Sequence, residues 1–180
     1  ALFRDMAERA KATVAPVSSW AGVAAEIERF LAAQALPGPI RVAPDPELNE
    51  LASALAARLP VGRGPAAPDD ATTVTGTFAG IAETGTLMTV SSPAHPTLLN
   101  LLAPNHIAVL RADRIVGSYE EAFARLIERL GDKPWPRTVN LITGPSRSAD
   151  IEQKIQYGAH GPRRLHIVLV GADGGEAGRA

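Results

Sequence analysis

Residues able to do chemistry gather in two glycine-containing turns of this sequence. The first turn, residues 81–86, reads IAETGT and places one carboxylate, Glu83, among hydroxyl side chains and next to a glycine. Such a glutamate is either exposed on a tight turn or held in a pocket by neighbouring donors. In a pocket its pKa would shift, and Glu83 would be a candidate acid, base or nucleophile. Spacing alone leaves both interpretations open.

The second turn, residues 143–162, reads TGPSRSADIEQKIQYGAHGP. It follows an apolar, β-branched run at 138–142 that predicts a buried strand. Gly144 would let the backbone come close to a neighbour, and Pro145 removes a hydrogen-bond donor and stiffens the turn. The turn is therefore built for a defined conformation after a strand.

A short helix is expected within this second turn. Ile151 and Ile155 are four residues apart, and Gly158 would end the helix. Either Ser146 or Ser148 can cap its start, which leaves free backbone N–H groups at the positive end of the helix. Such an end suits an anion.

Two carboxylates complicate an anion site at this position. Asp150 and Glu152 fall in the first turn of the expected helix. There they would interact favourably with the helix dipole but would repel a phosphate. The segment is therefore either a carboxylate-bearing functional loop or simply a well-capped helix.

The composition excludes several kinds of site. The 180 residues contain no cysteine, which excludes disulfides, thiolate catalysis and cysteine-ligated zinc or iron–sulfur centres held by this chain. The four histidines, at positions 95, 106, 160 and 166, show no paired spacing, so no metal site and no cofactor are expected in this chain. A lone histidine at the start of a strand, as at His106, is more often a structural hydrogen-bonding group than a catalyst.

Charge and hydropathy limit the kinds of partner and the cellular location that can be expected for the protein. With 18 basic and 19 acidic residues the formal net charge is −1, so no global field attracts nucleic acid or an anionic membrane. No apolar run approaches the roughly 20 residues that span a bilayer, and no signal peptide is visible in this sequence. We expect a cytoplasmic protein that binds neither nucleic acid nor membrane.

Strand-like and helix-like segments alternate along the chain. The expected strands cover residues 13–17, 40–43, 72–75, 87–91, 106–110, 114–116, 138–142 and 165–170. The expected helices cover residues 1–12, 20–31, 46–59 and 118–130. This alternation predicts an α/β fold with a mostly parallel sheet and helices on both faces. Ligands bind such sheets beyond the carboxyl ends of the strands, where the loops of Glu83 and Ser146 would lie.

One domain is expected over residues 1–170, because 180 residues suffice for one hydrophobic core. It would begin with the helix at 1–12. Residues 60–70, rich in Pro and Gly, are expected to form an irregular loop, and residues 171–180 a flexible tail.

Several motifs carry a resemblance to a known family. They are IAETGT at 81–86, HIAV at 106–109, GPSRSADIE at 144–152, HGP at 160–162 and LHIVLV at 165–170. In these motifs, which follow the family's order over about residues 72–170, the chain resembles the lactate-utilisation (LUD) domain family of the LutC/YkgG type. The resemblance implies a three-layer α/β arrangement similar to the NagB/RpiA/CoA-transferase-like fold.

The resemblance also implies a function. It indicates a subunit of a cytoplasmic lactate-utilisation system that oxidises L-lactate to pyruvate, in which iron–sulfur partner proteins carry the clusters. The lack of cysteine in this chain agrees with that division of labour. The alternative is a stand-alone enzyme, or a module that binds a small carboxylate or phosphate, of the same fold group and using Glu83. Whether this chain is itself an enzyme stays open.

Site residues are carried over from the family by position. The implied catalytic residues are Glu83 and His106. The implied ligand-binding residues are Thr84, Gly85, Thr86, Gly144, Pro145, Ser146, Arg147, Asp150, Glu152 and His160. One departure concerns residues 91–96, which read SSPAHP and lack the basic residue expected there from the family. An anion contact from that loop would require His95 to substitute.

Overall fold

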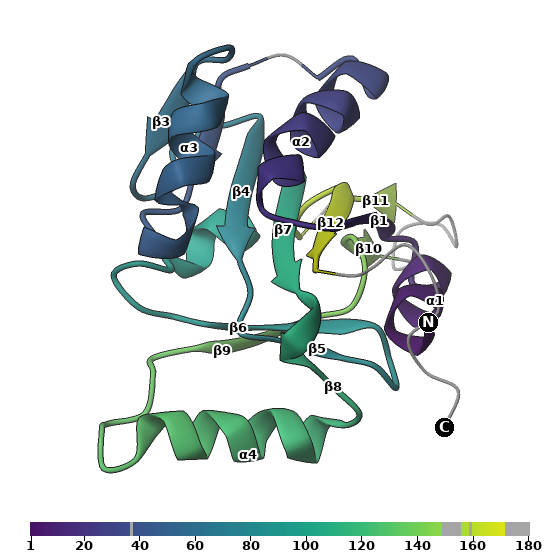
Figure 1. The fold of residues 1–180 in the computed structure, drawn as a ribbon, viewed down its shortest axis with the longest axis vertical. Helices are drawn as coiled ribbons and strands as arrows, with labels where there is room; N and C mark the ends of the chain where they lie inside the picture. The colour runs from purple at the N-terminus through teal and green to yellow at the C-terminus, as the bar shows by residue number, and fades with distance from the viewer. Residues whose placement is uncertain (37, 149–155, 159, 172–180) are drawn as a thin grey trace.

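The computed structural model of the protein describes residues 1–36, 38–148, 156–158 and 160–171. Its central sheet has six strands, and every pairing between neighbours in it is parallel. The strands in spatial order are β1 (Thr13–Val17), β12 (Arg164–Val170), β7 (Asn105–Arg111), β4 (Thr72–Gly76), β2 (Ile40–Val42) and β3 (Val61–Arg63) (Figure 1). The predicted α/β class is therefore confirmed.

Two helices cover one face of this sheet. They are α2 (Ala21–Ala33) and α3 (Asn49–Ala56), the latter entered through a 3-10 turn at Pro46–Leu48. Their apolar stripes pack on alternate residues of the strands, as parallel strands buried on both faces require. The largest fully buried side chains of this layer are Ile27, Leu48, Leu55, Ile40 and Ile107.

The other face carries helix α1 (Leu2–Arg9) and a second sheet. The second sheet has the order β8 (Ile115–Val116), β5 (Ala79–Ile81), β6 (Thr86–Val90) and β9 (Val139–Ile142). Phe3 of α1, Leu87 of the second sheet and Leu110 of the parallel sheet belong to one buried cluster. Helices thus lie on both faces of the parallel sheet, as expected, but the second sheet was not expected.

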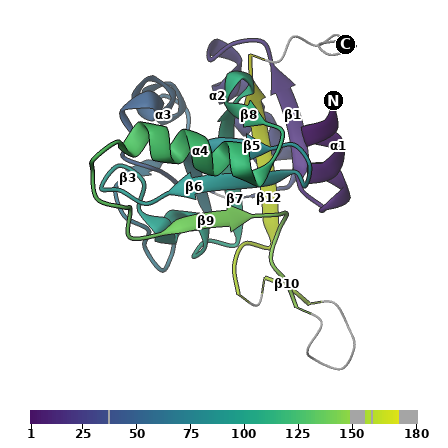
Figure 2. The same cartoon turned by 90° about the horizontal axis from the view of Figure 1, so that it is seen from below.

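Helix α4 (Tyr119–Leu130) lies on the far side of the second sheet (Figures 1 and 2). Its buried residues Ala122 and Leu126 pack against Ile81 and Met88. The helix begins where the sequence predicted, because the Ser118 side chain accepts a hydrogen bond from the backbone N–H of Glu121. Gly131 follows its last turn.

Three local predictions need correction. The 138–142 segment is an edge strand, β9, which runs antiparallel to β6 and is only half buried, with Leu141 44% exposed. The loop predicted at 60–70 contains strand β3. Most of the helix predicted after Ser148 lies outside the described residues, but its expected last residues, Gln156–Tyr157, form strand β11, which pairs antiparallel with β10 (Arg147–Ser148).

Strand β1 forms one edge of the parallel sheet and pairs with β12 alone in the described part of the chain. The carbonyl of Val17 accepts a hydrogen bond from Gly171 N, so this residue's backbone faces β12. Backbone groups of successive strand residues point to opposite sides, and the nitrogen of Pro16 therefore faces away from β12. None of the helices described is long and apolar enough to cross a bilayer.

Candidate functional site

Half of the predicted site residues converge on one cavity of about 360 Å³, called here the amino-end cavity. Gly144–Arg147, His106 and His160 all line it. His106 and Leu165 are the second residues of β7 and β12, and they are paired across the sheet. The cavity therefore lies at the amino ends of these strands, and the expectation that the Ser146 loop lies at their carboxyl ends is wrong.

His106 is 1% exposed and takes part in a chain of buried hydrogen bonds. Its Nε2 lies 2.8 Å from Thr75 Oγ1, whose hydroxyl donates to Asn100 Oδ1 at 3.2 Å. Asn100 Nδ2 in turn donates to Thr89 Oγ1 at 3.1 Å. The Thr75 hydroxyl has one proton: if it donates to Asn100, Nε2 of His106 carries the ring proton and donates to Thr75, and if it donates to Nε2, the ring proton lies on Nδ1.

The second ring nitrogen of His106, Nδ1, is buried and has no hydrogen-bond partner among the residues that the structure describes. Burial lowers the pKa of His106 to about 4, so the ring is neutral at neutral pH. The site therefore contains one buried ring nitrogen that is unpaired among the described residues.

The loop on the opposite wall of the cavity is held by its own hydrogen bonds. Ser146 N donates to the carbonyl of Pro162 at 2.8 Å, and Gly158 N donates to the carbonyl of Ser146 at 3.0 Å. Ser146 Oγ accepts from His160 N at 3.3 Å. The side chains of His160 and Arg147 are exposed, so two groups able to carry positive charge stand at the solvent side of the cavity.

Two of the predicted glycines have a packing role. Gly144 has a φ of 72°, and a Cβ there would overlap the carbonyl oxygen of Ala10. Gly85 has a φ of 67°, and a Cβ there would overlap the backbone nitrogen of Ala7. The close approach predicted for Gly144 is confirmed, and the neighbour is the carboxyl end of α1.

Glu83 lies outside the amino-end cavity and is exposed. Its Oε1 accepts a hydrogen bond from Tyr119 N at 3.0 Å, at the first residue of α4. A carboxylate at that place stabilises the helix start. Of the two interpretations of Glu83, the structure supports the exposed turn, and Glu83 does not line the cavity that the Gly144 loop lines.

A cluster of hydroxyl groups connects the first turn to the cavity. Thr86 Oγ1 lies 2.7 Å from both Thr84 Oγ1 and Thr143 Oγ1, and Thr143 lines the cavity. The Tyr119 hydroxyl is 3.1 Å from Thr84 and 3.0 Å from Thr86, and these two hydrogen bonds lower its pKa. Sequence patterns had assigned Tyr119 to a scaffold helix and so did not indicate this contact.

The predicted ligand-binding residues Asp150 and Glu152 lie outside the described residues. Within the described part of the chain, no group of three or more histidine or acidic side chains could hold a metal ion. The side chains that line the amino-end cavity are the hydroxyls of Thr143 and Ser146, the neutral ring of His106, the exposed Arg147 and His160 at the rim, and apolar residues.

A second cavity of about 730 Å³, called here the carboxyl-end cavity, lies beyond the carboxyl ends of β2 and β4. Asp45, 5% exposed, accepts a hydrogen bond from Glu47 N at 2.9 Å through Oδ1, and its Oδ2 lies 3.4 Å from His95 Nε2. A Cβ on Gly76 would come within 2.8 Å of Asp45 Oδ2. The absence of a side chain at Gly76 therefore makes room for this carboxylate.

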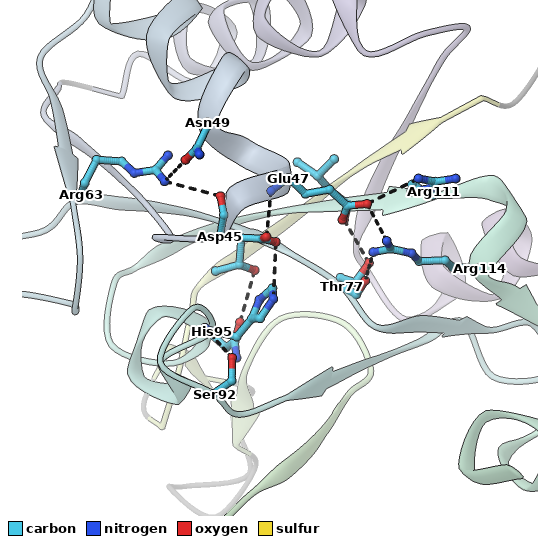
Figure 3. Close-up of polar contacts among 12 residues, drawn as sticks. Asp45, Glu47, Asn49, Arg63, Thr77, Ser92, His95, Arg111 and Arg114 are labelled. Carbon is cyan, nitrogen blue, oxygen red and sulfur yellow. Dashed lines mark hydrogen bonds and ion pairs between the residues drawn. The ribbon is translucent and has the colours of Figure 1, made fainter. Parts of the chain in front are cut away.

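Ion pairs build the wall beside Asp45 (Figure 3). Glu47 Oε1 lies 2.6 Å from Arg114 Nη2 and 3.4 Å from Arg111 Nη1. Arg114 Nη1 also donates to the Thr77 carbonyl at 3.0 Å. Asp45 caps the 3-10 turn at Pro46–Leu48. The sequence gave no signal for the Asp45–His95 contact, since these residues are 50 positions apart.

Comparison with known proteins places the chain in a family. The model of the LUD domain matches residues 70–170. The chain belongs to the LUD domain family. All residues that line the amino-end cavity lie within the matched segment.

Individual relatives match a part of the chain. It is 41% identical over 95 residues to the uncharacterized protein NMB1437 of Neisseria meningitidis, which covers 53% of this chain and 40% of that protein. It is 34% identical over 91 residues to lactate utilization protein C of Macrococcus caseolyticus, covering 50% and 39%. The matched segments thus span about two fifths of the length of these curated relatives.

A solved structure shares the fold over nearly the whole chain. The crystal structure of a DUF162 family protein from Deinococcus radiodurans superposes with a TM-score of 0.67 and covers 94% of both chains at 23% identity. At that identity the similarity shows the fold alone.

Proposed function

We propose that this protein acts in lactate utilisation. The observation that carries the proposal is its similarity to lactate utilization protein C within the LUD domain family. In the proposed role the chain is one subunit of a cytoplasmic system that oxidises L-lactate to pyruvate. Iron–sulfur partner proteins would carry the electrons, because these 180 residues contain no cysteine to ligate a cluster.

Exposed apolar side chains near the amino-end cavity support contact with partner chains. Leu101 and Leu141 line the cavity and are 38% and 44% exposed, and Leu98 and Leu102 in the same loop as Leu101 are exposed too. Exposed apolar groups that cluster on a surface often mark an interaction site. A partner seated there would stand at the mouth of the cavity.

Gene deletion in the organism that encodes the protein tests this role. The deletion strain should fail to grow on L-lactate as sole carbon source and should grow normally on glucose, and the intact gene should restore growth. Affinity purification of the tagged protein from lactate-grown cells should recover iron-containing partner proteins. Normal growth of the deletion strain on L-lactate would overturn the proposal.

A second candidate function is the binding of a small carboxylate or phosphate without partners. The exposed Arg147 and His160 at the rim of the amino-end cavity favour it. Glu83 lies elsewhere, so we no longer propose it as the acid, base or nucleophile of this function. Turnover or ligand binding by the isolated protein, with normal growth of the deletion strain on L-lactate, would support this candidate over the first.

A further inference from the structure

We propose that the carboxyl-end cavity binds a small phosphate ester with a flat apolar organic part, and that Arg129 and Lys133 contact its phosphate group. This site is separate from the amino-end cavity, and the proposal does not depend on the role in lactate utilisation. The volume of about 730 Å³ is within the usual range for ligand sites. The cavity also lies beyond the carboxyl ends of parallel strands, where ligands bind α/β sheets.

Two cationic side chains at the end of α4 carry the argument. Arg129, in the last turn of the helix, and Lys133, four residues later, both line the cavity and are exposed. Within the described part of the chain, neither side chain makes an ion pair, and the neighbouring Glu128 and Asp132 do not line the cavity. A phosphate monoester carries a charge of about −1.5 to −2 at pH 7 and would match these two positive charges.

Arg129 is also held in place for such a contact. Its Cζ lies 5.4 Å from the centroid of the Phe78 ring, in a cation–π contact. This contact positions the guanidinium without using its N–H groups as hydrogen-bond donors to the protein. Those groups stay available for phosphate oxygens, and a side chain that is already positioned loses less freedom when a ligand binds.

The carboxyl end of α4 works against an anion but does not outweigh the side chains. A helix carboxyl end carries about half a negative charge, whereas Arg129 and Lys133 together carry two full positive charges. Two of the last carbonyl groups are already occupied, because Leu130 O accepts from Lys133 N at 2.9 Å and Ile127 O accepts from Gly131 N at 3.0 Å. The local charge is therefore positive.

Apolar side chains supply a surface for the organic part of the ligand. Besides the polar groups, the cavity is lined by Phe78, Val90, Leu126, Leu130, Pro134 and Pro136. A flat apolar group that contacts them would leave water, and burial of apolar area contributes about 25 cal/mol per Å². The cavity should therefore prefer an aromatic phosphate to inorganic phosphate.

Two carboxylates of the cavity set the orientation of the ligand. Asp45 and Glu47 follow β2 in the layer of the parallel sheet, whereas α4 lies on the far side of the second sheet (Figures 1 and 3). The charge of Arg114 is used there, since Arg114 Nη2 lies 2.6 Å from Glu47 Oε1. A phosphate would be repelled at this wall and attracted at the end of α4.

Titration calorimetry of the purified protein with phenyl phosphate tests the proposal, and three further probes separate its parts. Inorganic phosphate lacks the apolar part, phenol lacks the phosphate, and benzoate carries only one negative charge. Phenyl phosphate should bind about tenfold more tightly than each of them. In ¹H–¹⁵N NMR spectra the indole N–H of Trp135, which stands between the lining Pro134 and Pro136, should shift when phenyl phosphate is added, and that of Trp20, which packs against the core under α2, should not.

Variants test the two cations and the cavity separately. Arg129→Gln and Lys133→Gln should each weaken phenyl phosphate binding by about tenfold. Arg125→Gln is the matched control, because it removes the same charge one turn earlier on α4 from a residue that does not line the cavity, and it should leave the affinity unchanged. Ala94→Leu narrows the cavity without changing a charge, so it should weaken phenyl phosphate more than inorganic phosphate.

Several results would overturn the proposal. They are no binding of phenyl phosphate, equal affinity for phenyl phosphate and either inorganic phosphate or benzoate, and an equal loss of affinity in Arg125→Gln and Arg129→Gln. A shift of the Trp20 resonance alone would mean that the probe binds elsewhere. The four substituted residues are exposed or half-buried, so the urea midpoint of each variant should stay close to that of the native protein and any loss of binding can be assigned to the site.

Discussion

At the scale of single residues, the two buried histidines have different surroundings although burial lowers both pKa values to about 4. His166 is fully paired: Nδ1 lies 2.7 Å from Thr13 Oγ1, Nε2 lies 3.1 Å from Glu26 Oε1, and the ring stacks on Phe30. Among the residues that the structure describes, His106 has a partner for Nε2 only. His166 is thus explained by structure alone, and His106 is not.

Both histidines should make the protein sensitive to mild acid. An unfolded histidine has a pKa near 6.5, so below that pH the unfolded state binds protons that the native state excludes down to about pH 4. The stabilising contribution is complete above pH 6.5 and is lost as the pH falls toward 4. Between pH 7 and pH 5 the free energy of unfolding should drop by about 2 kcal/mol per histidine.

Urea denaturation at pH 7, 6 and 5 measures this loss. The variant His166→Gln should reduce the dependence of the free energy of unfolding on pH by the contribution of one histidine. The measurements stop at pH 5 so that the titration of Glu26 does not contribute. The hydrogen bond from Arg29 lowers the pKa of Glu26 below its ordinary value of 4.5. A pH-independent midpoint would show that neither histidine is held neutral in the native state.

The site residues could be predicted from the sequence only as segments. The motifs located the Gly144 loop and His106, which the structure brings together at one cavity. The position of Glu83 could not be predicted, because Glu83 meets Tyr119 only through the pairing of β5 with β8. A turn motif contains no information about such a distant partner, so spacing left both the exposed and the buried interpretation of Glu83 open.

At the scale of elements, α1 is tied to the site by the two glycines against which its carboxyl end packs. Gly144→Ala should cost about 3 kcal/mol or more, because the Cβ meets the Ala10 carbonyl in addition to the strain of a positive φ. Gly131→Ala is the comparison variant, since its φ is also positive, at 52°, but a Cβ there has no neighbour within 4 Å, so it should cost only the backbone strain, about 1–3 kcal/mol.

Chemical denaturation of both variants measures the difference. Equal costs for Gly144→Ala and Gly131→Ala would mean that α1 moves away freely and that its packing on this glycine contributes nothing. A larger cost at Gly144 together with faster proteolysis near Ala10 would show that α1 is displaced when the glycine is replaced.

The long elements were predictable, whereas some of the short ones were missed, although β2 and β8 were expected. Strands β7 and β12 stand out as apolar runs of seven residues, and helix α4 shows helical periodicity over twelve residues. Strands β3 and β5 have three residues each, too few for a repeating pattern. The helix predicted around Ile151 and Ile155 lies mostly outside the described residues; only its expected end, where Gln156–Tyr157 form β11, is contradicted.

At the scale of the whole molecule, the second sheet is what places two cavities at opposite ends of the parallel sheet. Ile142 of β9 lines the amino-end cavity, and Val90 of β6 lines the carboxyl-end cavity. The sequence indicated a single sheet, for which ligands are expected at the carboxyl ends alone. The amino-end cavity could not be predicted because its second wall is a sheet that pairs strands from three separate parts of the chain.

The edge strand β1 has a consequence for solubility. A strand edge with free N–H and C=O groups invites a second molecule to add its own strand and so to start aggregation. Pro16 faces that open edge with no N–H to offer, and its ring obstructs the approach of another backbone.

Pro16→Thr should therefore increase light scattering of concentrated solutions and leave the urea midpoint nearly unchanged, whereas Pro134→Thr, outside any strand, should change neither. Equal scattering by both variants would mean that the edge is protected by something other than Pro16. If the prediction holds, one proline keeps this sheet at six strands in crowded solution.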